Sequence, residues 1–209
     1  MSKYQSRFVR VVVAVVPLSL LTTLPLGAAP SEAPVAVSVK APMVCSHGPS
    51  DSAYSGVLTV PRSAPSGSTF AVRVDSRSSG QISHFGLNYI FDMTTDYPLP
   101  AGTSYVDGSA RVIPGTGTAN ARAGARVWHD AKGIHFVLPA HVENGSSYTP
   151  PSIEFALKVT APAGGDVAIK FAHYEVTANA FLVGNVHTFC DPSPKPYALA
   201  AVHIGPAAP

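Results

Sequence analysis

Alternation of apolar and polar residues at every second position is the feature that most constrains the fold of this chain. Ser152–Val159 and Asp166–Phe171 both alternate strictly, with aliphatic and aromatic residues on one face and mostly charged residues on the other. A period of two is that of a β-strand with one buried face. The link between them, residues 160–165, is rich in Pro and Gly. We therefore expect the two segments to form a hairpin with one solvent-facing side.

Similar short segments recur along the chain, the clearest being residues 70–75. The further strand candidates are residues 35–39, 55–60, 84–91, 104–112, 124–128, 133–138, 186–190 and 197–204. Residues 61–68 are predicted to be a loop. No segment keeps the spacing of an amphipathic helix beyond two turns. With 17 glycines and 20 prolines to form turns, about eight to ten short strands predict an all-β sandwich.

The N-terminal segment has the order of a secretory signal peptide. Three basic residues and no acid lie within residues 1–10, and an apolar run over residues 11–26 ends in small residues. The alternative is a membrane anchor. The run is about sixteen residues long, shorter than the roughly twenty that cross a bilayer, and Pro17 and Pro25 interrupt it. We therefore assign residues 1–33 to the signal peptide and the start of the mature chain, with no stable membrane span after cleavage.

Charge and length then define the mature protein. Without the N-terminal basic residues, eleven Lys and Arg stand against twelve Asp and Glu. Nucleic-acid binding needs a basic patch that releases counterions, so we exclude nucleic acid as a partner. The length suits one domain over residues 34–204, followed by a disordered tail over residues 205–209.

Cys45 and Cys190 are the only cysteines of the chain. In an exported protein a disulfide is the default for such a pair. Closing a loop of about 145 residues removes unfolded-state entropy worth on the order of 4 to 5 kcal/mol. The alternative is two free buried thiols. A redox motif is not expected, because no Cys-x-x-Cys spacing occurs.

A run of fifteen residues carries a family resemblance. Residues 95–109 read Thr-Asp-Tyr-Pro-Leu-Pro-Ala-Gly-Thr-Ser-Tyr-Val-Asp-Gly-Ser, followed later by the strand at 133–139 and the small polar loop at 143–147. With one residue inserted, the run resembles the conserved repeat domain of bacterial cell-surface proteins. The resemblance implies an immunoglobulin-like antiparallel β-sandwich. The bias toward Ala, Pro, Gly and Val, together with the predicted signal, also resembles exported actinobacterial proteins and implies secretion or a place at the cell envelope.

Within that run the residues suit the implied fold. Pro100 and Gly102 predict a turn, Tyr105 and Val106 the start of a strand, and Gly108 a bend near its middle.

Catalytic signatures are absent from the sequence: no Gly-x-Ser-x-Gly elbow, phosphate-binding loop or His-Glu-x-x-His pair occurs. His173 and Glu175 lie two residues apart, a spacing that presents two metal ligands on one strand face. The sequence supplies no third ligand, although His129 and His135 are candidates. Alternation predicts His135 as an outward-facing strand residue. We favour a solvated or hydrogen-bonded strand histidine over a metal site.

Other polar residues have structural explanations. Asp92 and Asp96 form a carboxylate pair, but Asp96 is expected in a turn. Lys158 and Lys170 are expected on polar faces, so no crosslink is predicted. The aromatic residues between positions 85 and 105 suit a core, or a platform for sugar rings or an apolar ligand if several are exposed on one sheet.

Taken together, these features predict an exported, non-enzymatic β-sandwich with a structural or binding role at the bacterial cell envelope. No cofactor is expected, and the partner is unknown, with a cell-wall or surface component as one possibility. Two alternatives stay open. One is a carrier of a hydrophobic ligand such as a lipid, which requires an apolar cavity. The other is a secreted metal-dependent hydrolase built around His173 and Glu175.

Overall fold

The computed structural model describes residues 32–48, 52–77, 85–115, 124–139 and 141–207, and these residues form an all-β protein. Fifteen strands and no helix occur in this part of the chain, so none of its segments is an apolar helix able to cross a membrane. The predicted signal segment and the tail residues 208–209 lie outside the described residues. The strands are β1 (Pro34–Cys45), β2 (Ala53–Pro61), β3 (Ser63–Pro65), β4 (Thr69–Ser76), β5 (Leu87–Tyr97), β6 (Thr103–Tyr105), β7 (Arg111–Ile113), β8 (Arg126–Asp130), β9 (Gly133–Leu138), β10 (Val142–Glu143), β11 (Ser152–Val159), β12 (Asp166–Phe171), β13 (His173–Ala180), β14 (Gly184–Pro192) and β15 (Tyr197–Gly205).

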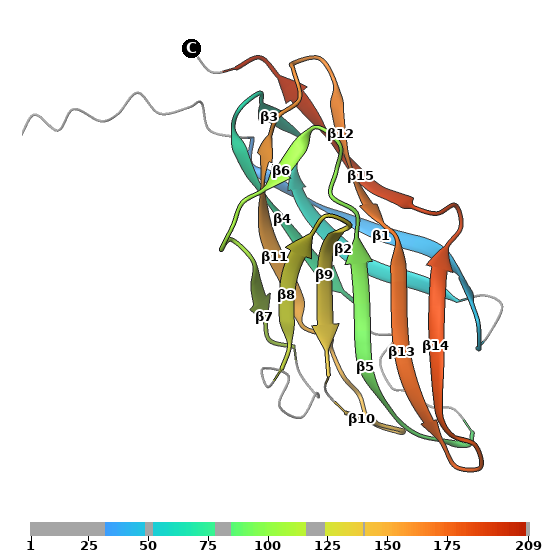
Figure 1. Ribbon diagram of the computed structural model, residues 1–209. Helices are drawn as coiled ribbons and strands as arrows, with labels where there is room; N and C mark the ends of the chain where they lie inside the picture. The colour runs from blue at the N-terminus through green and yellow to red at the C-terminus, as the bar shows by residue number, and fades with distance from the viewer. Residues whose placement is uncertain (1–31, 49–51, 78–84, 116–123, 140, 208–209) are drawn as a thin grey trace, which may run out of the picture.

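Strand β1 joins the two layers of the sandwich. It pairs with β2 from Pro34 to Pro42 and then with β14 through Met43, Val44 and Cys45. One layer has the order β6-β11-β4-β2-β1 and the other the order β1-β14-β13-β5-β9-β8, so that β1 makes them one continuous sheet. β7 pairs with β11 and β10 with β5, and a smaller sheet has the order β12-β15-β3. Figure 1 shows β5, β13 and β14 side by side, with β1 and β2 crossing behind them. The described strands form the all-β sandwich that the sequence predicts, and their pairing is antiparallel apart from that of β3 with β15.

The core is built by the period-two pattern. β11 buries every second residue, including Phe155 and Leu157, and β9 buries Ile134, Phe136 and Leu138 in the same way. Burying such side chains is the main favourable contribution to folding. The predicted bounds of β9, β11 and β12 are those of the structure.

The predicted hairpin between β11 and β12 is wrong. β11 pairs with β4, β6 and β7, whereas β12 pairs with β15 in the smaller sheet. The link at 160–165 carries the chain from one sheet to another. Alternation identifies the buried face of a strand but not its neighbour, and two strands of different sheets that bury one face in a shared core show the same pattern.

Several strand predictions also need correction. The strand predicted at 104–112 is broken into β6 and β7 by a turn, in which Ser109 N donates to the Val106 carbonyl at 3.2 Å. Gly108 sits in that turn at φ 72°, so it ends the pairing instead of bending one strand. Residues 63–65, predicted as loop, form β3. Only the first three residues of β13, His173 to Glu175, were predicted to lie on a strand. The fifteen strands exceed the eight to ten expected.

A buried aromatic cluster fixes the sheets to one another. The Tyr54 ring on β2 stacks on Phe171 of β12 at 4.4 Å between centroids, and its hydroxyl lies 3.1 Å from the hydroxyl of Tyr97 on β5. A second hydrogen bond of 3.1 Å links Tyr54 to Ser76. Burial raises the pKa of both tyrosines, so both hydroxyls stay protonated and available as donors.

Candidate functional site

The register of β13, β5, β9 and β8 places polar side chains in one row on the outer side of the sheet. His173 is the Cα partner of Asp96, Asp96 of His135, and His135 of Trp128. Asp191 on β14 extends the row through its hydrogen bond with His173. The adjacent Cys190, Thr95 and Phe136 face the core instead and are buried. We call Asp191, His173, Asp96, His135 and Trp128 the histidine row.

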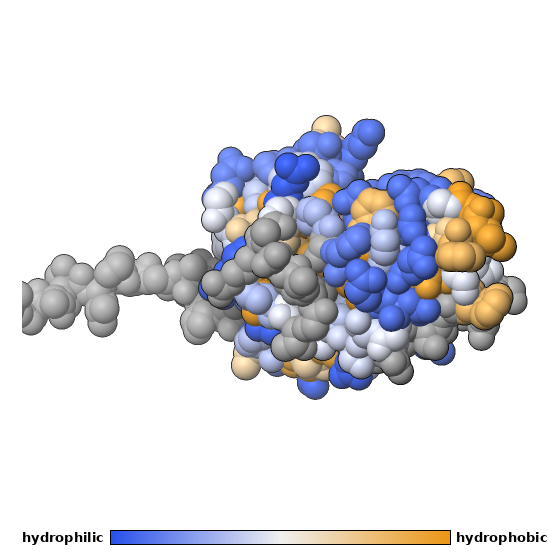
Figure 2. Space-filling view, turned by 90° about the horizontal axis from the view of Figure 1, so that it is seen from below, coloured by the Kyte–Doolittle hydropathy of each residue, from blue (hydrophilic) through white to orange (hydrophobic). Residues whose placement is uncertain are grey.

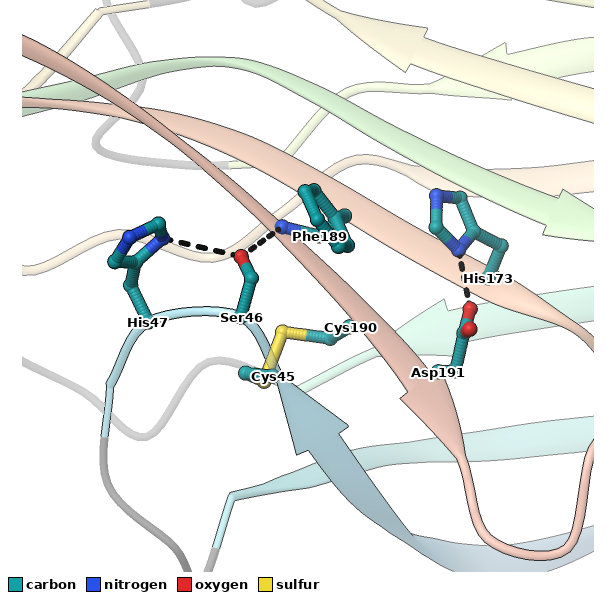
Figure 3. The surroundings of a disulfide bond; sticks show 7 residues. All are labelled: Cys45, Ser46, His47, His173, Phe189, Cys190 and Asp191. Carbon is teal, nitrogen blue, oxygen red and sulfur yellow. Dashed lines mark hydrogen bonds and ion pairs between the residues drawn. A yellow bond between two sulfur atoms is a disulfide. The ribbon is translucent and has the colours of Figure 1, made fainter.

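His173 is held between two carboxylates. Its Nδ1 lies 2.6 Å from Asp191 Oδ1 and its Nε2 lies 2.8 Å from Glu175 Oε1. Figure 3 shows the first of these contacts, beside the disulfide. Because an ionised carboxylate only accepts hydrogen bonds, both ring nitrogens donate, which requires the imidazolium form. Burial alone lowers the pKa of His173, but the hydrogen bonds to Glu175 and Asp191 outweigh it and raise that pKa above its usual value.

Further charged groups surround His173. Glu175 Oε2 lies 3.4 Å from His187 Nε2, and Lys195 Nζ lies 2.6 Å from Asp191 Oδ1. Although burial acts to raise the pKa of Asp191, hydrogen bonds from Lys195 and His173 lower it on balance. These contacts favour the ionised form of Asp191 and orient the carboxylates of both Asp191 and Glu175.

His135 repeats the arrangement on β9. Its Nδ1 lies 2.8 Å from Asp96 Oδ1 and its Nε2 2.9 Å from Asp130 Oδ1. Burial lowers the pKa of His135, yet the bonds to Asp130 and Asp96 raise it overall. The bond from His135 lowers the pKa of Asp130, helped by the backbone N–H of Lys132. Each histidine of the row therefore forms hydrogen bonds to two carboxylates, one from each ring nitrogen.

Exposed aromatic groups flank these ion pairs. The Trp128 ring stacks on His135 with centroids 5.3 Å apart and is 38% exposed, and the Arg126 guanidinium lies 5.3 Å from the same ring. At the other edge, Phe189 is the Cα partner of Glu175 and is half exposed. Exposed aromatic rings on β14 and β8 therefore flank a stretch of charged side chains on the three strands between them.

The disulfide predicted between Cys45 and Cys190 is formed and lies at the margin of this face. The two residues are directly opposite in β1 and β14, with Cα atoms 4.0 Å apart. Next to them, Ser46 N donates to the Phe189 carbonyl at 2.9 Å and Phe189 N donates to Ser46 Oγ at 3.2 Å. Figure 3 shows Ser46 between His47 and Phe189. The disulfide thus links β1 covalently to β14, next to Asp191 of the histidine row.

The structure brings some of the predicted site residues into contact and separates others. His173 and Glu175 share a strand face, as predicted, and are hydrogen bonded to each other. His135 points outward as predicted but reaches Asp96 and Asp130, and His129 stacks on Tyr105 at 4.1 Å. Among the described residues, no three His, Cys, Asp or Glu side chains are placed to hold a metal ion.

The turn predicted at Asp96 is wrong, because β5 continues to Tyr97. Asp96 therefore projects from a strand and pairs with His135 instead of acting with Asp92. Sequence reasoning also missed Asp191 and His187 as partners of His173 and Glu175. No local signal identifies them, because these contacts depend on the order β14-β13-β5-β9, which the sequence pattern does not encode.

Comparisons with known proteins give likenesses of architecture at very low identity. No protein-family model and no curated protein matches the chain. The C-terminal domain of the AgI/II polypeptide BspA of Streptococcus agalactiae is similar with a TM-score of 0.41 and 8% identity, over 78% of this chain and 59% of that one. This chain thus spans less than two thirds of that structure. The RrgA Jo.In complex gives a TM-score of 0.40 and 7% identity over 70% and 78%, and a cohesin module from a Clostridium perfringens family 33 glycoside hydrolase gives 0.32 and 9% over 73% and 97%.

Proposed function

We propose that this chain is an exported, non-enzymatic binding protein of the bacterial cell envelope, and that the outer face carrying the histidine row binds a cell-wall glycan. The observation that carries the proposal is the continuous row from Asp191 to Trp128. Its side chains project from paired strands, and ion pairs fix their rotamers. Such preorganisation lowers the entropic cost of binding.

The chemistry of the face suits sugar rings. A pyranose presents an apolar face that stacks on an aromatic ring and hydroxyl groups that donate to carboxylates. Trp128 and Phe189 supply exposed rings at the two edges. Asp96 and Glu175 lie on strands between them, and Asp130 lies two residues from Trp128 on β8. Each ionised carboxylate has about four acceptor sites, more than its histidine uses. A glycan chain laid across the strands would meet ring, carboxylate and ring in sequence.

The same contacts argue against His173 or His135 acting as a general base. A general base needs a nitrogen lone pair directed at the substrate. Both ring nitrogens of His173 and of His135 are engaged by carboxylates. Their raised pKa values also favour the protonated form.

The disulfide supports export. Disulfides persist in oxidising compartments and are rare in the reducing cytosol. Cys45 and Cys190 connect the two layers, so reduction would weaken the fold that positions β14. The signal peptide predicted within residues 1–33 agrees with this location, and the resemblance of residues 95–109 to surface-protein repeats supports the same proposal.

A pull-down with purified peptidoglycan carrying its wall polysaccharide tests the proposed function. We expect the disulfide-bonded protein to co-sediment with this material and Trp128→Ala to weaken binding about tenfold, as expected for loss of one stacked ring. Trp128→Phe restores part of the affinity. Val37→Ala, at a similarly exposed position of β1 away from the row, is the matched control. Absence of binding by the unmodified protein, or equal binding by Trp128→Ala, overturns the proposal.

A further inference from the structure

Four large apolar side chains gather at one end of the molecule. Phe181, Leu182 and Val183 form the turn between β13 and β14, and Phe85 lies in the loop before β5. We call these four residues the apolar tip. In Figure 1 the β13–β14 turn is the lowest point of the molecule, far from the C-terminus. Figure 2 looks at this end and shows hydrophobic surface concentrated at one corner.

The exposure of these side chains is unusual. Phe181, Leu182 and Val183 are between 71% and 88% exposed, and Phe85 is fully exposed. Single exposed apolar residues are common, but a contiguous patch marks an interaction site. The two loops are joined by a hydrogen bond from Phe181 N to the Gly86 carbonyl at 2.8 Å. The tip is therefore one preformed surface.

The two segments that form the tip carry no charged side chain and have polar amides at their base, and the carboxylate of Glu143 lies farther along, opposite Tyr89. Asn179 accepts a hydrogen bond from Asn88 at 2.8 Å and donates one to Asn185 at 2.7 Å, so a chain of amides lies at its base. Neither residues 85–89 nor residues 179–186 contain a charged side chain. An apolar end above a belt of amides matches the change from acyl chains to headgroups at a bilayer surface.

A second copy of this chain is a poorer occupant. Each of the two phenylalanines can bury about 150–250 Å², and Leu182 and Val183 are smaller and already partly covered. The tip alone therefore does not exceed the roughly 800 Å² per partner of a standard protein interface. The tip is also convex, and two convex tips share little surface. A fluid bilayer encloses protruding side chains from all sides without a matching socket.

We propose that the apolar tip inserts into the interfacial region of a lipid bilayer. Because the tip lacks charge, insertion needs no anionic lipid and is insensitive to salt. The tip is at the end of β13 and β14, whereas the histidine row lies on their outer side. Membrane contact thus leaves the row accessible, and this proposal stands independently of glycan binding.

Co-sedimentation with phosphatidylcholine vesicles tests this inference on the disulfide-bonded protein. We expect binding at both low and high salt, and at least a tenfold loss in the double variant Phe181→Ser/Leu182→Ser. The matched control Val44→Ser removes an exposed apolar residue of β1 that lies opposite Asp191, at the end of β14 remote from the tip. This variant should bind as the unmodified protein does. Unchanged thermal unfolding shows that the variants are folded.

Three results overturn the proposal: no binding of the unmodified protein to these vesicles, equal binding by the double variant, or binding that high salt abolishes. Sedimentation velocity without lipid provides a further check. A concentration-dependent dimer that the double variant loses would assign the tip to self-association instead.

Discussion

His173 on β13 lies directly opposite Asp96 on β5, and this pairing joins two histidine–carboxylate groups into one row. On one side His173 contacts Asp191 and Glu175, and on the other Asp96 contacts His135. Acid and base therefore alternate over four adjacent strands. The face is rigid because each charged group is held by at least one neighbour of opposite charge.

The row makes stability depend on pH. The pKa values of His173 and His135 are raised in the folded protein, so their contribution is complete below the unfolded histidine pKa of about 6.5 and is lost as pH rises through the folded values. We expect about 0.5 to 1 kcal/mol per histidine, the range of solvent-screened pairs. Urea unfolding between pH 5.5 and 9 measures this decline. A double variant His173→Gln/His135→Gln should show a flatter profile, and an identical slope would contradict the assignment.

Reduction of Cys45–Cys190 should strongly destabilise the fold. The bridge closes a loop with a sequence separation of 145, for which chain entropy predicts about 4 to 5 kcal/mol. Urea unfolding with and without dithiothreitol measures the difference. The Cys45→Ala/Cys190→Ala variant serves as control, because its stability should match that of the reduced protein and be insensitive to reductant. Reductant-insensitive stability of the unmodified protein would be inconsistent with the bridge.

Tyr54 contributes through both its ring and its hydroxyl. Tyr54→Phe keeps the stack on Phe171 but removes the hydrogen bonds to Tyr97 and Ser76, at an expected cost of about 0.5–1.5 kcal/mol per bond. Tyr54→Ala also leaves a cavity and should cost about 3–5 kcal/mol. Chemical denaturation distinguishes the two. Similar losses for both variants would show that the stack with Phe171 contributes little.

Gly133 should tolerate no side chain. A Cβ there would lie 2.3 Å from the carbonyl oxygen of Tyr97, and the residue has φ 148°. Gly133→Ala therefore forces β9 away from β5, and we expect a loss of more than about 1 kcal/mol. Gly165→Ala is the control, because no atom lies within 4 Å of its Cβ. Thermal unfolding compares the two, and equal melting temperatures would refute the predicted clash.

The sequence predicts individual strands far better than their neighbours. Alternation located β9, β11 and β12 because each buries one face completely. It missed most of β13, whose residues are all half buried, so that no strong apolar stripe marks it. It also paired β11 with β12 wrongly, since a shared core imposes the same pattern on strands of different sheets.

The candidate site shows the same limit. His173 and Glu175 were identifiable as a pair, because two positions on one strand share a face whatever the topology. Asp191 bonds to His173, and Asp96 lies opposite it, only because β14 and β5 flank β13 in the sheet. Those strand pairings join residues far apart in the sequence. The disulfide was predictable because export and a single pair of cysteines leave one pairing.

Histidine ring signals in two-dimensional NMR test most directly whether the histidine row binds a wall glycan. On titration with soluble peptidoglycan fragments carrying wall polysaccharide, we expect the ring signals of His135 and His173 to shift together with the Trp128 indole. His203 pairs with Asp166 in the smaller sheet and should stay unchanged. Shifts confined to His203, or none at the row at saturating glycan, would contradict glycan binding by the row.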